Sequence, residues 1–390
     1  MHLDEVGQSN AHYDIVRQAL DLEQLQNVNI SKHYPSPDGL SDFRYVVKLG
    51  VGLSDHGHLR VGAWGRGSRN IIPIPKCQVA APILRRTMNS VAHFVIEHNL
   101  QPYTPHNERG ILRSVVLRAS RTTGEVMVTL IAGKREKKLL DFAEDLAQSA
   151  TEIVGVWLHV NSAEGNAIFT RSQTGDIVIR RLVGKPTITE KIGDVVYEIG
   201  PGDFFQTNPS TAKILYDRTL ERLSLDEDSA FLDLYCGVGG LALQAAKTAG
   251  WVLGVEEADG AVQRARDAAR KNNLSIDFIS ERVIWAVEDI KQRLKGIVPV
   301  ISVNPARRGL EEGVVAAIVD LNPRTVAYIS CNPRAMAEDL KLFATHGYEI
   351  GDVEVFEMFP NTAHMECLVV LTNPTAGEQQ RRVPKRRVAR

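Results

Sequence analysis

Cysteine is scarce in this chain, with four among 390 residues and no paired spacing between them. That pattern does not suit a disulfide framework and is typical of a reducing cytoplasm. Long apolar runs are also absent, because no stretch approaches the roughly 20 residues that cross a bilayer. The first residues have neither a basic flank nor an apolar core. We therefore expect no signal peptide, no membrane partner and a cytoplasmic location.

The net charge of −1 conceals an uneven distribution. Between Asp55 and Lys138, fourteen Lys and Arg residues stand against five acids, and a second basic cluster runs from Arg381 to Arg390. A chain that is neutral overall but basic in patches suits a phosphate backbone. Solvated faces and a disordered tail are the alternative. We expect the first cluster to supply most phosphate contacts, so that charge reversal at Arg113, Arg118 and Arg121 weakens binding unless strand alternation turns some of them away from the RNA.

The hydrophobic pattern changes three times along the chain. Residues 1–42 are polar, with one weak helical pattern around Ile15 to Leu25. Residues 43–200 carry alternating or β-branched runs, with helical stretches near 81–99 and 136–150, and predict an α+β domain of antiparallel strands. Residues 201–373 alternate short apolar runs with helices, which predicts a parallel, doubly wound α/β sheet buried on both faces. Residues 374–390 form a basic tail.

A glycine-rich turn follows the first strand of the α/β part, in the segment from Asp233 to Gly240. Glycine lets the backbone approach a ligand closely. Glu256 ends the next strand, 19 residues beyond Gly237, where a carboxylate can accept hydrogen bonds from a ribose. With Asp233, this pattern fits S-adenosylmethionine better than NAD. Tyr235 either lies against that ligand or packs in the core.

Three polar residues lie at the boundaries of later apolar runs. Cys331 lies where a β-branched and aromatic run stops and a helix begins, and Glu366 heads another apolar run. A thiol and a carboxylate placed in this way suit covalent addition by a nucleophile, followed by removal of a proton by a base. Asn304 can donate and accept at once and so read an amide-like base edge, although a turn-forming Asn before Pro is the competing interpretation.

Together these segments resemble the RNA uracil-C5 methyltransferase family, and most of all its 23S ribosomal RNA branch. The resemblance is carried by five segments, namely 204–209, 233–240, 303–309, 330–332 and 358–366. It implies a Rossmann-like class I methyltransferase domain after an RNA-binding α+β domain. It also implies that Cys331 adds to uracil C6 and that Glu366 is the base. By the same resemblance Gln206, Tyr235, Glu256 and Asn304 contact S-adenosylmethionine or the target base.

Two departures from the family pattern stand out. Members of that branch carry an iron–sulfur cluster on three N-terminal cysteines and a fourth that Cys77 resembles, but no cysteine precedes Cys77 here. We therefore expect no cluster, no metal ligands, and direct packing of Ile15 and Leu20 over the place where it would lie. The second departure is Ala306 in place of a proline, which loosens a loop and removes no functional group.

Other functions remain open from the sequence alone. A transfer RNA uridine demands the same chemistry as a ribosomal one, and a non-catalytic RNA-binding or folding factor could keep the same fold. An adenine-N6 methyltransferase would want an aromatic residue at Arg307, and a cytosine-C5 enzyme a cysteine at Ala306. We expect the enzyme to be a monomer.

Overall fold

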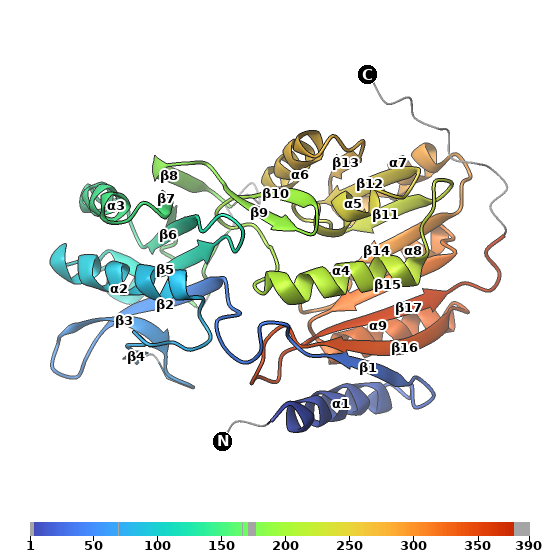
Figure 1. Ribbon diagram of the computed structural model, residues 1–390, viewed down its shortest axis with the longest axis horizontal. Coiled ribbons are helices and arrows are strands. Elements are labelled where there is room, and N and C mark those ends of the chain that lie inside the picture. The colour runs from blue at the N-terminus through green and yellow to red at the C-terminus, as the bar shows by residue number, and fades with distance from the viewer. Residues whose placement is uncertain (1–3, 69, 166, 171–176, 378–390) are drawn as a thin grey trace. The chain divides into compact units, whose positions relative to one another are not determined.

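The computed structural model describes residues 4–68, 70–165, 167–170 and 177–377 (Figure 1). The chain divides into two compact units. Unit 1 comprises Met1–Leu40, Ile192–Tyr197 and Asn208–Arg390, and unit 2 comprises Ser41–Lys191 and Glu198–Thr207. The N-terminal forty residues thus belong to the same unit as the C-terminal half, although the sequence pattern sets residues 1–42 apart.

Unit 1 is built on an eight-stranded sheet in the order β1-β16-β17-β15-β14-β11-β12-β13. Neighbouring strands are parallel, except that β17 runs antiparallel to both β15 and β16. The central strands are buried along their whole length, as a sheet covered on both faces requires. The strands are β1 (Ile30–Tyr34), β11 (Ala230–Leu234), β12 (Trp251–Glu256), β13 (Asp277–Ser280), β14 (Pro299–Val303), β15 (Thr325–Ser330), β16 (Glu349–Phe356) and β17 (Glu366–Thr372).

Helices cover both faces of this sheet, which confirms the predicted doubly wound fold. On one side α4 contacts α5 and α5 contacts α6, and α4 lies across the front of the sheet in Figure 1. On the other side α7, α8, α9 and α1 contact one another in turn and share one apolar core with the strands. The helices are α1 (Glu5–Leu22), α4 (Pro209–Leu223), α5 (Gly240–Ala245), α6 (Asp259–Lys271), α7 (Val283–Leu294), α8 (Val314–Asp320) and α9 (Pro333–Thr345).

The N-terminal segment is more ordered than its polar composition indicates. Helix α1 begins at Glu5, ten residues before the apolar pattern, because Asp4 caps it by accepting the backbone N–H of Gly7 at 2.7 Å. Leu20 is fully buried and Ile15 packs partly against the same core. Strand β1 escaped the sequence prediction because an edge strand gains its hydrogen bonds from β16 and needs no apolar alternation.

Unit 2 contains a seven-stranded sheet in the order β4-β3-β2-β5-β6-β7-β8 with helices α2 and α3 packed in its core, as the predicted α+β domain requires. One expectation was wrong, because β6 and β7 are parallel and not antiparallel. Helix α3 is the crossover that carries the chain back to start β7 beside β6. The elements are β2 (Val46–Leu53), β3 (Leu59–Trp64), β4 (Ile71–Ile72), α2 (Pro82–Glu97), the 3-10 helix η1 (Pro105–Asn107), β5 (Leu112–Ala119), β6 (Val126–Ala132), α3 (Lys138–Ser149), β7 (Ile153–Val160) and β8 (Ile179–Gly184).

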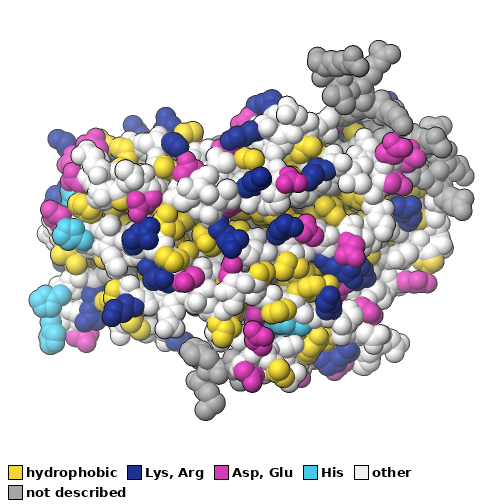
Figure 2. Space-filling view, in the orientation of Figure 1, with side chains coloured by type: hydrophobic (Ala, Val, Ile, Leu, Met, Phe, Trp, Pro, Cys, Tyr) yellow, Lys and Arg dark blue, Asp and Glu magenta, His cyan; other side chains and the backbone are white. Residues whose placement is uncertain are grey.

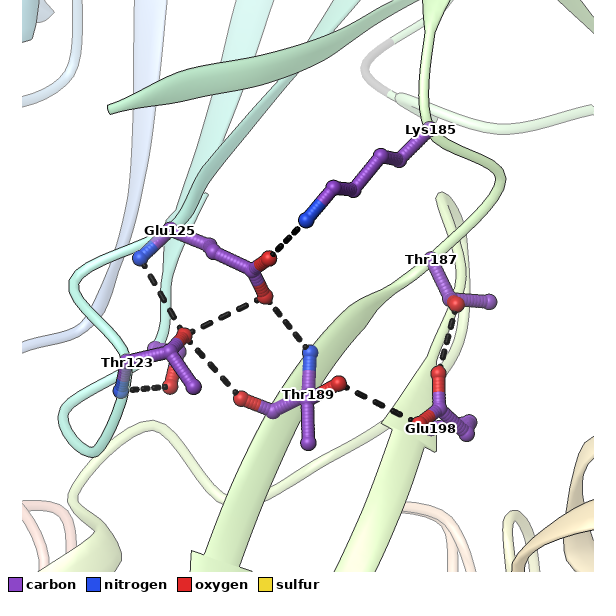
Figure 3. Close-up of polar contacts among 7 residues, drawn as sticks. Thr123, Glu125, Lys185, Thr187, Thr189 and Glu198 are labelled. Carbon is purple, nitrogen blue, oxygen red and sulfur yellow. Dashed lines mark hydrogen bonds and ion pairs between the residues drawn. The ribbon is translucent and has the colours of Figure 1, made fainter. Parts of the chain in front are cut away.

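The hairpin of β9 (Ile188–Ile192) and β10 (Val195–Ile199) contains two of the points where the chain passes between the two units. Within unit 2, the Glu125 carboxylate accepts hydrogen bonds from Lys185 Nζ, just before β9, at 2.6 Å and from the backbone N–H of Thr189 in β9 at 3.0 Å (Figure 3). Glu198 accepts from the Thr187 hydroxyl at 2.6 Å. These charge-assisted bonds fix where the chain leaves unit 2.

Candidate active site

The candidate site lies in unit 1, at the carboxyl ends of the parallel strands. From β11 the chain passes to β12 and β13 on one side, then returns to β14 and β15 on the other. Ligands of doubly wound sheets bind at such a reversal. Glu256, Asn304 and Cys331 lie at the ends of β12, β14 and β15, respectively, so the structure places them along one edge.

The glycine turn after β11 has an unusual backbone. Tyr235, Gly237 and Gly239 have φ values of 64°, 56° and 86°, all in the left-handed region. A tyrosine there is uncommon and points to a functional constraint. Glu256 holds the turn, because its two carboxylate oxygens accept the backbone N–H groups of Gly237 at 3.1 Å and Ala258 at 3.0 Å. The carboxylate as a whole has about four acceptor positions, so at least one remains that could accept a ribose hydroxyl.

Asp233 anchors the glycine turn to the neighbouring elements. It is 3% exposed, and its carboxylate accepts hydrogen bonds from the Ala242 N–H at 2.9 Å and the Ser302 hydroxyl at 2.7 Å. Burial raises its pKa to about 6. Because these donors come from α5 and β14, Asp233 ties the turn to both neighbours and so orients Tyr235 and Gly237.

Cys331 immediately precedes α9, whose N-cap Asn332 accepts the backbone N–H of Arg334 at 3.2 Å. The amide of Asn332 donates to the Arg307 carbonyl at 2.7 Å, so it also fixes the loop after β14. Cys331 is partly exposed. Burial raises the pKa of its thiol, Glu366 raises it further, and Arg307 lowers it through charge and a hydrogen bond.

Glu366 begins β17 and is 3% exposed. Burial raises its pKa to about 8, with the charge of Arg307 acting in the opposite direction. Within the part of the chain that the structure describes, its Oε2 atom has no hydrogen-bond partner. A buried carboxylate oxygen without a donor is costly, and such atoms are concentrated where a ligand supplies the missing contact.

The sequence singles out Arg307 only as the position where an adenine-N6 methyltransferase would have an aromatic residue. In the structure it is exposed, interacts with both Cys331 and Glu366, and brings a guanidinium nitrogen to 3.5 Å from His364 Nδ1. The signal available in the sequence was its position two residues after the proline of a strand-end Asn-Pro pair. Gln206 is buried and belongs to unit 2, whereas the other predicted site residues belong to unit 1.

Two of the cations expected to bind phosphate have internal roles instead. The Arg113 guanidinium donates to the carbonyl oxygens of Asn161, Ala163 and Gly165 at 2.9, 2.6 and 3.0 Å. Arg118 donates to the Asp203 carbonyl at 2.6 Å, and burial lowers its pKa to about 10. Both guanidinium groups thus donate to backbone carbonyl oxygens of the protein, as the alternative that some of these side chains turn away from the RNA requires.

The surface of the described residues mixes charges of both signs. On the face shown in Figure 2, Lys and Arg side chains are interspersed with acidic ones and do not gather in a single patch. Exposed cations of unit 2 are available for phosphate contact at Arg60, Arg109, Arg135 and Lys138. The basic tail expected at 374–390 lies outside the described residues from position 378 onward.

Comparison with known proteins identifies the family of this chain. The model of the tRNA (uracil-5-)-methyltransferase family matches residues 117–374. The chain belongs to that family. A Bacillus cereus protein called an uncharacterized RNA methyltransferase is 32% identical to this methyltransferase over 377 residues, covering 95% of this chain and 79% of the relative. One from Geobacter sulfurreducens is 30% identical over 357 residues, covering 91% and 70%.

A solved structure agrees with these relatives. The tRNA (uracil-54, C5)-methyltransferase of Pyrococcus abyssi, in complex with S-adenosyl-L-homocysteine, superposes with a TM-score of 0.70 at 25% identity. The match covers 93% of this chain and 83% of that one. The present chain is accordingly an S-adenosylmethionine-dependent RNA uracil-5-methyltransferase with a class I fold. Its glycine turn and the Glu256 carboxylate fit that cofactor.

Neither a membrane-spanning helix nor a clustered metal site occurs among the described residues. None of the helices described is both long enough and apolar enough to span a bilayer. Likewise, no three His, Cys, Asp or Glu side chains in the described ranges are grouped as ligands for a metal ion.

Proposed function

We propose that this methyltransferase modifies C5 of a uridine in 23S ribosomal RNA through a covalent intermediate on Cys331. The observation that carries the mechanism is the juxtaposition of Cys331 and Glu366 at the ends of β15 and β17. The ribosomal target is supported by Asn304 before Pro305, by the Gly-Val-Gly-Gly turn and by the Thr-Ala-His segment at 362–364, which resemble the ribosomal branch. A cytoplasmic location and a monomeric state belong to the same proposal.

The first step is addition of the Cys331 thiolate to C6 of the uracil. The new S–C6 bond moves the electrons of the C5–C6 double bond toward the O4 carbonyl, so that C5 becomes nucleophilic. Two features favour the thiolate in this chain, namely the positive N-terminal end of α9 and the Arg307 guanidinium. Bound S-adenosylmethionine supplies the methyl group that C5 takes up.

Glu366 completes the reaction. After methylation C5 carries both a methyl group and a proton, and the Glu366 carboxylate removes that proton. The electron pair reforms the C5–C6 double bond and expels the Cys331 thiolate. Because burial raises the pKa of Glu366 to about 8, its carboxylate, once ionised, is a stronger base than an exposed one.

The remaining site residues hold the reactants. We assign Glu256 to the ribose of the cofactor and Tyr235 to its flank, with Gly237 permitting close approach of the backbone. Asp233 acts on the cofactor through the turn that it anchors. Asn304 reads the uracil edge, and Gln206 is assigned to the cofactor or the base on the family resemblance alone.

The RNA must release its uridine from the base stack before Cys331 can reach C6. That costs a few kcal/mol in a duplex and less in a single-stranded loop. Exposed cations of unit 2 would hold the neighbouring phosphates, whose contacts are independent of sequence. We therefore place the target uridine in an unpaired loop.

Transfer RNA is the second candidate substrate. Two findings favour it, because the family is described as acting on tRNA and the Pyrococcus abyssi structure is of a tRNA (uracil-54, C5)-methyltransferase. Mass-spectrometric mapping of 5-methyluridine in RNA from cells with and without the gene separates the two. Loss of a single 23S site supports the proposal, and loss of a tRNA site with intact ribosomal RNA refutes the ribosomal assignment.

A further inference from the structure

The loop between β16 and β17, residues 357–365, leads directly into Glu366 and is called the base loop here. Helix α1 contacts its middle. Gln8 Oε1 accepts the backbone N–H of Asn361 at 2.7 Å, and His12 Nε2 lies 2.9 Å from the Thr362 carbonyl oxygen. Both α1 side chains are almost fully buried, with 4% and 1% of their surface exposed. Polar side chains rarely lie so deep unless they are held by specific partners.

The partners determine which nitrogen of His12 carries a proton. A carbonyl oxygen only accepts, so His12 Nε2 must donate to Thr362. In neutral His12 the other nitrogen, Nδ1, then accepts a hydrogen bond from His33 Nε2, which lies 3.1 Å away. The two rings stack with centroids 5.4 Å apart. A relay from β1 through α1 to the base loop therefore fixes the ring that holds Thr362.

The segment after β1 holds the start of the same loop. The backbone N–H of Ser36 donates to Glu357 Oε2 at 3.1 Å, and the backbone N–H of Glu357 donates to the Tyr34 carbonyl at 2.9 Å. In the middle of the loop Asn361 has a φ of 62°, a left-handed conformation that costs free energy in a residue other than glycine. The first forty residues thus hold the base loop at its start, through Glu357, and in its middle, through Asn361 and Thr362.

We propose that the N-terminal segment is a brace that positions Glu366, with Gln8 and His12 as its positioning residues. The inference rests on the proposed role of Glu366 as the base. Thr362 precedes Glu366 by four residues, so release of the loop there allows the carboxylate to shift. A base works only within hydrogen-bond reach of the proton, and a displacement of about 1 Å can cost roughly 100-fold in rate. Addition and methylation do not need that base and should continue.

The test compares full-length variants in a single-turnover reaction with the RNA substrate and S-adenosylmethionine. His12→Phe keeps the ring and removes the donor, Gln8→Ala removes the acceptor, and His12→Gln restores an amide donor near the position of Nε2. The double variant Gln8→Ala with His12→Phe should raise the fraction of protein cross-linked to RNA on a denaturing gel by roughly 10-fold. His12→Gln alone should return that fraction toward the wild-type value, and S-adenosylmethionine affinity should be unchanged.

Two further variants make the result decisive. Val16→Ala lies in the core on the same helix and lowers stability without touching the base loop, so it should leave the adduct fraction at the wild-type level. If Val16→Ala accumulates adduct as well, or if the double variant releases product normally, the brace is refuted. Glu366→Gln is measured alongside. If Glu366→Gln accumulates adduct and the double variant does not, the brace proposal is wrong and the proposed base stands. If Glu366→Gln forms no adduct, the proposed role of Glu366 as the base is wrong as well.

Discussion

Cys331 and Glu366 adjoin the last register pair at one end of the antiparallel strands β15 and β17. Ser330 of β15 is the register partner of Cys367 of β17, so the next residue on one strand meets the preceding residue on the other. Facing side chains in such a pair lie about 5 Å apart at Cβ. The charge of Glu366 accordingly raises the pKa of the Cys331 thiol. The proposed nucleophile and the proposed base thus come together although 34 residues separate them in the sequence.

Replacing Cys331 by serine should abolish methyl transfer, because a hydroxyl in this setting is a far weaker nucleophile than a thiolate. Affinity for S-adenosylmethionine should remain, since Glu256 and the glycine turn are untouched. Calorimetric titration of the cofactor together with incorporation of a labelled methyl group checks both. Turnover at the wild-type rate in the serine variant would rule out the covalent mechanism.

Glu366→Gln should form the RNA adduct, methylate the base and then stall, because the amide cannot remove the C5 proton. The measurement is a denaturing gel, on which a slowly migrating protein–RNA band should accumulate. Cys331→Ser provides the control, since it should give no such band. Normal product release without an adduct would remove Glu366 from the mechanism.

The raised pKa of Glu366 also predicts a dependence of stability on pH. An ordinary glutamate ionises near 4.5 and this one at about 8, so between these values the folded state binds more protons than the unfolded state. The free energy of unfolding should therefore fall as pH rises through that window. The stability that Glu366 contributes through its bound proton is fully present below about pH 4.5. Glu366→Gln removes it, so urea unfolding of the variant should vary less with pH than that of the wild type. An identical slope in both proteins would contradict the assignment.

Iron content offers a separate test of the N-terminal segment. Ile15 and Leu20 pack into the core of unit 1, and no cysteine precedes Cys77 in the sequence. Protein purified without oxygen should therefore be colourless and contain no stoichiometric iron. Metal analysis with an absorption spectrum decides this. A one-to-one cluster signal would mean that ligands other than cysteine, or another molecule, contribute to a site.

Binding of RNA should depend on the exposed cations of unit 2 and not on Arg113 and Arg118, whose guanidinium groups donate to backbone carbonyl oxygens of the protein. Arg135→Ala with Lys138→Ala should lower the slope of log affinity against log salt by about 0.7 to 0.9 for each phosphate that is no longer neutralised. Deletion after Gly377 should lower it modestly and leave the modified site unchanged. Arg113→Ala is the matched comparison, and it should reduce thermal stability because it frees the backbone carbonyls of residues 161–165. If tail deletion alone abolished binding, the RNA surface would have to be assigned to the C-terminus.

The sequence by itself determined the features that depend on neighbouring residues. The α/β rhythm after Gly202, the glycine turn with Glu256 one strand later, and Cys331 at a strand-to-helix junction are all local patterns, and the structure shows each of them. The doubly wound sheet follows because short apolar strands separated by helices bury both faces. A parallel sheet then brings successive strand ends to one edge, so the sequence also predicts that the candidate residues at these ends lie along one edge.

Only the tertiary structure decided the contacts between distant segments. Nothing local indicates that β15 and β17 pair in the register that places Cys331 opposite Glu366, or that Gln8 reaches Asn361 across 353 residues. In the sequence Arg113 and Arg118 of β5 could equally face solvent, yet both donate to backbone carbonyl oxygens of the protein. Strand alternation gives two equivalent faces, and the choice between them depends on how the rest of the chain packs. That choice is made by burial and hydrogen bonding summed over the whole fold, which no short window of sequence contains.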